Sequence, residues 1–221
     1  SAVDRSRRLL DLDADPDAVA GTLRRDPVLK DRGPFKKGTR LPGTVDGFEI
    51  AARAILGQQV SVAAARKLAS RLVGLCGDVL AQPDHGLTHR FPTPRRVVAA
   101  DLGGMGVPSR RLATLKSVAL RAAEGRLDLD AGADRTELQR SLVEIPGVGP
   151  WTASYIAMRL GDPDVFLSDD LGVKRALGSS SPVESEELAA NWSPWRSYAV
   201  LHLWNSTTRN GKEPAKRRSA S

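Results

Sequence analysis

The stretch Leu142-Val143-Glu144-Ile145-Pro146-Gly147-Val148-Gly149-Pro150-Trp151-Thr152-Ala153 places a glycine-rich turn between two segments with helical patterns. Downstream of the turn, Trp151 and Tyr155 repeat at the spacing of one helix face. Two glycines allow positive φ angles and the close approach of another molecule, and Pro150 suits the first turn of a helix. The stretch predicts a helix-hairpin-helix whose backbone amides bind an anion such as a DNA phosphate.

This hairpin supplies four candidate DNA contacts: Gly147, Val148, Gly149 and Thr152. Taken alone, a Gly-Val-Gly turn between two helices is more often only a turn. Two adjacent carboxylates, Asp169 and Asp170, follow some twenty residues later at the start of another helix. Their presence strengthens the DNA interpretation. It also favours catalysis over a phosphate clamp alone, because such a clamp needs no carboxylate.

Composition favours a globular protein with an anionic partner. The chain has 221 residues, of which 41% are hydrophobic, which is enough for a core and excludes wholesale disorder. A net charge of +7 and a pI near 10.0 favour nucleic acid as the partner. Part of this charge lies in a basic tail after about residue 206, which we expect to be disordered.

Several kinds of site are excluded by the cysteine and histidine content. The single cysteine, Cys76, excludes an internal disulfide, a four-cysteine zinc site and a four-cysteine iron–sulfur cluster. It follows apolar residues, so we expect a buried thiol. The histidines His85, His89 and His202 lack metal-ligand spacing, and no metal site is predicted. No membrane-length apolar run and no signal-peptide pattern are present, so we expect a soluble, intracellular protein without membrane contact.

Helix-start signals and helical periodicity recur along the chain, and no segment shows the strict alternation of a strand. About ten helices are predicted, which defines an all-α fold. Residues 26–46 and 76–92 are predicted to be a connection and a loop, and Ser185 is predicted to cap a helix that reaches Asn191. The first four residues resemble a boundary or an internal join. A preceding domain was removed, or this form lacks it, or another domain is fused ahead, and the sequence leaves these three alternatives open.

Asp170 is the first candidate for catalysis. Cleavage of an N-glycosidic bond builds positive charge at the sugar C1′ atom, and a fixed carboxylate stabilises that charge or activates a water molecule. The alternative is that Asp169 or Asp170 only caps the following helix. The hairpin upstream favours a catalytic role for one of the two.

Four blocks in this order resemble the helix-hairpin-helix DNA glycosylase superfamily: Ala54–Ser61, Leu142–Ala153, Val165–Asp170 and Pro194–Ala199. The first and last narrow the resemblance to the 3-methyladenine DNA glycosylase II family of the AlkA type, over roughly residues 5–206. The resemblance implies two helical subdomains with the hairpin beside the active cleft. One would span 45–163 and the other 1–44 with 164–221, and the N-terminal β-rich domain of the family would be absent.

The same resemblance implies that Asp170 is the catalytic aspartate and that Trp151, Tyr155 and Trp204 line the pocket for a flipped base. Alkylated bases are electron-poor, and aromatic faces attract such rings. The alternative is that these aromatic residues belong to the core. Related bifunctional glycosylases carry a lysine where this chain has Trp151, so we expect a monofunctional enzyme without lyase activity.

Base flipping requires a residue that fills the gap in the stack, and in the family this residue comes from the loop that matches residues 57–61. Well-known members carry leucine where this chain has Gln59. A glutamine can fill the gap and hydrogen-bond the orphaned base, or it can be a solvent-facing turn residue. No cofactor is expected, although a monovalent cation at the hairpin carbonyls would fit the family.

The sequence therefore predicts a monofunctional DNA glycosylase of base excision repair that removes alkylated purines of the 3-methyladenine type. Its expected partner is double-stranded DNA with damaged bases, bound by a monomer in the cytoplasm, at the bacterial nucleoid. The alternatives are a non-catalytic helix-hairpin-helix module, a glycosylase for hypoxanthine, uracil or oxidised guanine, and a structural all-α protein with surplus positive charge.

Overall fold

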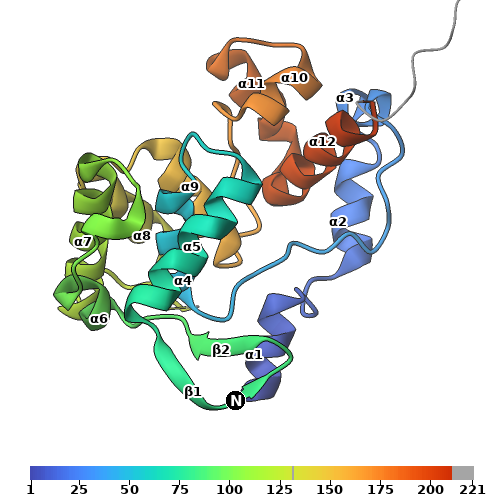
Figure 1. Cartoon of the computed structure of the whole chain (residues 1–221). Helices are drawn as coiled ribbons and strands as arrows, with labels where there is room; N and C mark the ends of the chain where they lie inside the picture. Colours follow the sequence, from blue (N-terminus) through green and yellow to red (C-terminus); the bar gives the residue numbers. More distant parts are fainter. Residues whose placement is uncertain (131, 211–221) are drawn as a thin grey trace, which may run out of the picture. The chain divides into compact units, whose positions relative to one another are not determined.

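The computed structural model describes residues 1–130 and 132–210, and this part of the chain is mostly helical (Figure 1). The predicted all-α class is confirmed, with one two-stranded exception. Two compact units are present: Ser1–Gly43 with the described residues from Gly161 onward, and Thr44–Leu160. None of the described helices is both long and apolar enough to span a membrane.

In its described residues, the Thr44–Leu160 unit holds six α-helices, a 3₁₀ turn and one hairpin of strands. Its elements are α4 (Gly47–Leu56), α5 (Val62–Cys76), β1 (Asp78–Asp84), β2 (Leu87–Arg90), α6 (Pro94–Ala99), η1 (Gly103–Met105), α7 (Ser109–Ala123), α8 (Arg135–Val143) and α9 (Pro150–Arg159). One apolar core joins these helices, with Ile55, Leu72, Leu115, Leu142 and Ile156 each less than 1% exposed. The hairpin α8–α9 is therefore built on a packed helical scaffold.

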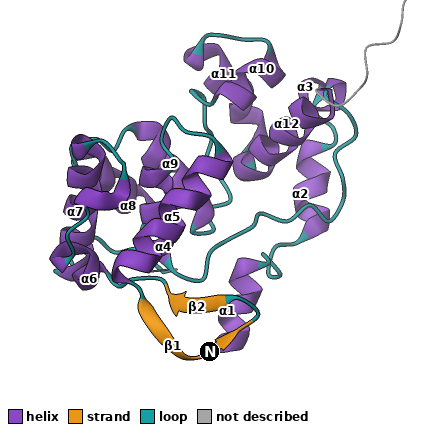
Figure 2. Ribbon diagram, in the orientation of Figure 1, coloured by secondary structure: helices purple, strands orange, loops and turns teal. Residues whose placement is uncertain are grey.

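The β1–β2 hairpin corrects the prediction that residues 76–92 are loop (Figure 2). The strands are antiparallel, and Asp84 pairs with Leu87 across a two-residue turn of His85 and Gly86, which both have positive φ. Positive φ at both turn residues matches the twist of a tight hairpin. Periodicity did not reveal these strands because they are almost entirely exposed, so no face alternates between apolar and polar residues.

The other unit contains only helices in its described part: α1 (Ala2–Leu9), α2 (Pro16–Leu23), α3 (Pro27–Asp31), α10 (Leu171–Leu177), α11 (Pro182–Ala189), η2 (Ala190–Trp192) and α12 (Arg196–Asn210). Tyr198 is 2% exposed and donates a 2.8 Å hydrogen bond to Asp11, while Arg196 pairs with Asp164 at 2.8 Å. These contacts tie the N-terminal segment and the loop before α10 to α12.

Three predictions in this unit require correction. The 26–46 connection contains α3, which Asp26 caps ahead of Pro27. The helix predicted to start after Ser185 is α11, which starts at Pro182 because Ser181 accepts the capping hydrogen bond, and it ends at Ala189. The basic tail does not begin at about residue 206, since α12 continues to Asn210; the remainder of that predicted tail, residues 211–221, lies outside the described residues.

Candidate functional site

The turn of the α8–α9 hairpin depends on Gly147. Its φ angle is +92°, a conformation that L side chains rarely adopt, and an ideal Cβ there would collide with Oγ1 of Thr114. Thr114, on α7, is 2% exposed and donates a 2.8 Å hydrogen bond to the carbonyl of Pro146. A glycine at position 147 therefore lets the turn lie directly against α7.

A second side chain holds the next carbonyl of the turn. Nε2 of Gln58 donates to the carbonyl oxygen of Gly147 at 3.0 Å and to Oγ1 of Thr152 at 3.1 Å. Consecutive carbonyls, those of Pro146 and Gly147, are thus fixed by side chains from two other elements. The backbone conformation of the turn is set before any ligand arrives.

The first turn of α9 presents backbone donors rather than side chains. Gly149 precedes Pro150 as the N-cap and supplies no side-chain cap, and an added Cβ at Gly149 would meet nothing within 4 Å. The first N–H groups of a helix lack intrahelical partners and carry partial positive charge. Val148 and Thr152 are 5% and 4% exposed, so in this conformation neither of these two predicted contacts offers its side chain to DNA, and the Val148 amide donates to the carbonyl of Ile145 at 2.9 Å.

The hairpin carbonyls, at which a monovalent cation was predicted, accept hydrogen bonds from protein donors. Donors already engage the carbonyl oxygens of Leu142, Ile145, Pro146 and Gly147: the amides of Ile145 and Val148 at 3.0 and 2.9 Å, and the side chains of Thr114 and Gln58. Each carbonyl oxygen has a second lone pair, so these hydrogen bonds leave the cation untested. The cation stays a prediction, and no step is assigned to it.

Gln59, the predicted wedge, lies in the loop between α4 and α5. Its side chain is exposed and its φ angle is +55°. A left-handed conformation costs a non-glycine residue about 1 kcal/mol or more, and such strain is most frequent at functional sites. The strain does not itself decide between the wedge and a solvent-facing turn residue.

Trp151 and Tyr155 form a stacked pair on α9. Their ring centroids are 5.3 Å apart and the planes differ by 6°. Both side chains are half-buried, in contrast to Trp192, which is fully buried in the other unit. The pair therefore keeps part of its surface outside the core.

Asp170 is held by three N–H donors on the same oxygen. Its Oδ1 atom accepts hydrogen bonds from Nε1 of Trp204 at 2.7 Å and from the amides of Gly172 and Val173 at 2.8 and 3.0 Å. Asp170 is therefore the N-cap of α10, as the alternative interpretation expected. The cap and a catalytic role are compatible, because the cap fixes the rotamer of a half-buried carboxylate.

The neighbouring Asp169 is arranged differently. Its side chain is 64% exposed and pairs with Lys174 at 2.9 Å. Of the two adjacent carboxylates, Asp170 is the one that both a helix end and an aromatic side chain restrain. The structure also links Asp170 to Trp204, which the sequence interpretation placed in the base pocket.

Three residues of these arrangements were missed in the sequence. Gln58 and Thr114 hold the hairpin turn, and Gly172 allows Trp204 to approach α10, since an added Cβ would lie 2.8 Å from Cδ1 of Trp204. Gln58 gave a signal, because it lies beside Gln59 in one of the four blocks. Thr114 gave none, because a threonine on a buried helix face is common.

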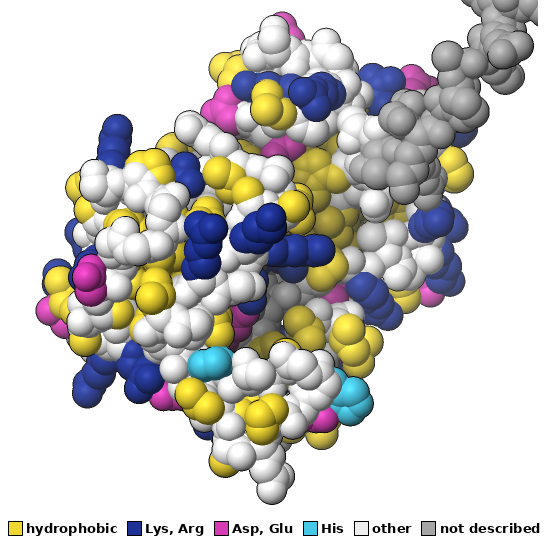
Figure 3. Space-filling view, viewed as in Figure 1, with side chains coloured by type: hydrophobic (Ala, Val, Ile, Leu, Met, Phe, Trp, Pro, Cys, Tyr) yellow, Lys and Arg dark blue, Asp and Glu magenta, His cyan; other side chains and the backbone are white. Residues whose placement is uncertain are grey.

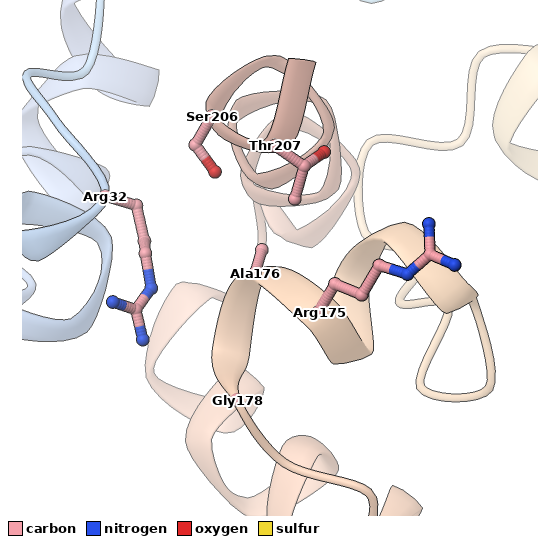
Figure 4. A pocket seen from close by; sticks show the side chains of 6 residues that line it. All are labelled: Arg32, Arg175, Ala176, Gly178, Ser206 and Thr207. Atoms are coloured by element: carbon pink, nitrogen blue, oxygen red, sulfur yellow. The ribbon is translucent and has the colours of Figure 1, made fainter. Parts of the chain in front are cut away.

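An open cavity of about 480 Å³ lies in the unit that contains α10 and α12 (Figure 4). Its lining includes Arg32, Arg175, Ser206 and Thr207. None of the predicted catalytic, base-pocket or hairpin residues lines it. Nη2 of Arg32 donates a 3.3 Å hydrogen bond to the carbonyl of Leu177, the last residue of α10, so this arginine satisfies a carbonyl at the C-terminal end of that helix.

The next features are the charged side chains on the surface and the side chains that could bind a metal ion. Lys and Arg side chains appear at many points of the face in Figure 3, with Asp and Glu between them. Among the residues that the structure describes, no group of three His, Cys, Asp or Glu side chains could hold a metal ion.

Cys76 is buried, and this burial raises the pKa of its thiol, although nearby Arg96 opposes the effect. The prediction of a buried thiol is confirmed.

Comparisons with known proteins identify relatives over most of the chain. The family model described as the AlkA N-terminal domain matches residues 1–46, where this chain has helices α1–α3 and no strand. The sequence interpretation expected that domain to be absent from the chain. The family model instead matches residues 1–46, so part of the chain is similar to that domain.

Among curated relatives, the "Probable bifunctional transcriptional activator/DNA repair enzyme AlkA" of Mycobacterium tuberculosis is 44% identical over 93% of this chain, which spans 42% of that relative's length. "DNA-3-methyladenine glycosylase 2" of Escherichia coli is 42% identical over 89% of this chain and 68% of its own.

Among solved structures, the 3-methyladenine DNA-glycosylase of Archaeoglobus fulgidus superposes with a TM-score of 0.77 at 26% identity, over 96% of this chain and 76% of its own. The hairpin, the restrained aspartate and the stacked aromatic pair thus occur in a chain whose sequence and fold both match one group of proteins. The chain belongs to the AlkA-type DNA-3-methyladenine glycosylase family, which has the helix-hairpin-helix glycosylase fold.

Proposed function

We propose that the protein is a monofunctional DNA glycosylase of base excision repair, which hydrolyses the N-glycosidic bond of alkylated purines in duplex DNA. The observation that carries the proposal is the restrained carboxylate of Asp170, which the Trp204 indole and two α10 amides hold in one orientation. Family membership supplies the reaction class, because a relative that is 42% identical is named DNA-3-methyladenine glycosylase 2.

In this proposal each group has a separate task. The backbone amides at the start of α9 bind a DNA phosphate. The stacked Trp151 and Tyr155 rings hold the extrahelical base, and an electron-poor alkylated purine gains most from that aromatic face. Asp170 stabilises positive charge at C1′ as the base departs and orients the water molecule that attacks it.

The absence of a lysine at position 151 supports hydrolysis rather than lyase chemistry, because a Schiff base with the sugar needs an amine. We further propose that the protein acts as a monomer on damaged double-stranded DNA in the cytoplasm, at the bacterial nucleoid. A monovalent cation at the hairpin carbonyls is part of the proposal, and no step depends on it.

The test is base release from duplexes that each carry one lesion: 3-methyladenine, 7-methylguanine, hypoxanthine, uracil or 8-oxoguanine. The expected result is release of the alkylated purines, with strand breaks only after alkali treatment. Breaks without alkali would contradict the monofunctional assignment. Binding of every duplex without any base release would favour the non-catalytic module, and release of a different base would redirect the substrate.

A further inference from the structure

Gln58 joins two parts of the Thr44–Leu160 unit that lie far apart in the sequence. It belongs to the short loop between α4 and α5, and its Nε2 atom reaches the hairpin turn 89 residues later. The same atom also donates to Oγ1 of Thr152 in the first turn of α9. Thr152 is 4% exposed, so its hydroxyl is shielded from water that would compete for this bond.

The loop that Gln58 tethers is tight and strained. The amide of Val60 donates to the carbonyl of Gly57 at 3.4 Å, which closes the turn around Gln58 and Gln59. Gln59 has a φ angle of +55° and an exposed side chain. A side chain that projects from a strained, four-residue turn keeps its direction only while the turn is anchored, and Gln58 supplies an anchor beside it.

The other end of the tether is the carbonyl of Gly147. In a trans peptide the N–H and C=O groups point in opposite directions, so a donor that fixes a carbonyl also fixes the following amide. Thr114 fixes the carbonyl of Pro146 and hence the direction of the Gly147 amide. Gln58 does the same for the carbonyl of Gly147. Gln58 belongs to the loop that carries Gln59, and its side chain contacts the turn that is expected to hold phosphate.

We propose that Gln58 is a positioning residue that holds Gln59 in register with the hairpin turn, so that phosphate binding and insertion of Gln59 into the base stack are coupled. The inference rests on the proposed function, because it assumes that both segments contact the same damaged duplex. The competing interpretation is that Gln58 is a half-buried polar residue that only satisfies the Gly147 carbonyl. That role would affect stability without coupling to Gln59.

The test is a double-mutant cycle of Gln58→Met and Gln59→Ala. Methionine matches the length of glutamine, lacks a donor and adds no charge that would repel DNA. Gln82→Met, on the exposed β1 strand, makes the same chemical change as a control. The readout is affinity for a duplex with a tetrahydrofuran abasic analogue, relative to an undamaged duplex, because binding does not depend on base release.

Gln58→Met is expected to weaken binding of the abasic duplex by about tenfold, because Gln59 and the hairpin turn are no longer held in register, while Gln82→Met leaves it unchanged. Gln59→Ala is expected to weaken binding in the wild-type background and to add less than about twofold in the Gln58→Met background. Independent, multiplying effects would overturn the proposal, as would a Gln58→Met affinity equal to that of wild type. If Gln58→Met does not fold, Gln58→Asn, which is too short to reach Gly147, replaces it.

Base release by the wild type is measured in parallel. If the wild type releases no base and the cycle still shows coupling, the proposed function fails while the positioning role stands. If the wild type releases base and the cycle shows no coupling, the positioning role fails alone.

Discussion

The N-termini of α9 and α10 are two helix ends built in opposite ways. α9 starts after Gly149, which supplies no side-chain cap. α10 starts after Asp170, and the carboxylate of that residue accepts from the amides of Gly172 and Val173. An uncapped end suits an external anion such as phosphate, whereas a capped end fixes an internal carboxylate.

In the function proposed above, this one structural device serves two tasks. Both ends concentrate partial positive charge from backbone N–H groups. At α9 no side chain of the N-cap residue engages that charge, and contacts from Gln58 and Thr114 fix the preceding turn. At α10 it orients Asp170, and Trp204 adds a third donor. The predictions below test whether the two ends separate binding from chemistry.

Replacing Asp170 by alanine removes the cap and the negative charge together. Base release is expected to fall by about a hundredfold or more, and the free energy of unfolding by about 1 kcal/mol. Ser181→Ala is the matched control, since Ser181 caps α11 in the same unit. It is expected to cost similar stability without loss of base release. Equal activity losses in both variants would show that capping alone matters.

At the uncapped end, Gly147→Ala should be the most damaging glycine substitution. Positive φ and the collision with Thr114 are expected to cost about 2 kcal/mol of stability and to weaken duplex binding. Gly149→Ala is the control, because its φ is −89° and its Cβ would meet nothing within 4 Å. It should change stability by less than about 0.5 kcal/mol. Urea unfolding and duplex titration measure both, and equal destabilisation would contradict the geometry.

The contact between Trp204 and Asp170 can be disrupted without a substitution at either residue. A Cβ at Gly172 would lie 2.8 Å from Cδ1 of Trp204 and 3.0 Å from Oδ1 of Asp170. Gly172→Ala is therefore expected to displace the indole and to lower base release by about tenfold, at a stability cost near 1 kcal/mol. Tryptophan fluorescence reports the displacement, and unchanged fluorescence with unchanged base release would remove Trp204 from the site.

Gln59→Gly should raise stability while it lowers duplex affinity. Glycine adopts the φ of +55° without strain, and the expected gain in the free energy of unfolding is about 0.5 to 1 kcal/mol. A stabilised variant with wild-type affinity for abasic duplex would identify Gln59 as an ordinary turn residue. Thermal unfolding and the same duplex titration decide between the two outcomes.

Asp164 is a carboxylate that we expect to contribute to stability and not to base release. Burial acts to raise its pKa, but hydrogen bonds from Arg196 and Ser193 outweigh burial and hold the pKa below its ordinary value of 3.8. The unfolded chain therefore binds the proton at higher pH than the folded chain, so this contribution is complete above 3.8 and is lost as the pH falls through the folded value. Urea midpoints between about pH 6 and about pH 3 should fall less for Asp164→Asn than for wild type. Parallel curves would contradict this assignment.

The two helix ends were not equally readable from the sequence. The α9 end is a local pattern, since Gly147, Gly149 and Pro150 act through their own backbone preferences. Asp170 was also recognisable, but as two alternatives, and only the structure shows that it caps α10 and accepts from Trp204 at the same time.

The contacts that support these ends are long-range, and periodicity carries no information on them. Gln58 reaches across 89 residues and Trp204 lies 34 residues from Asp170. The β1–β2 hairpin escaped for a different reason, because exposed strands lack an apolar face. Local signals thus predicted the all-α class and the hairpin motif, while tertiary hydrogen bonds had to be observed.

The most direct test of the central claim is single-turnover release of 3-methyladenine by Asp170→Asn, with enzyme in excess over the duplex. Asparagine keeps an oxygen that can cap α10 and accept from Trp204, so only the negative charge is removed. The account predicts unchanged thermal stability, nearly unchanged duplex affinity and base release slower by about a hundredfold or more. Base release at the wild-type rate would contradict it and would leave Asp170 as a helix cap alone.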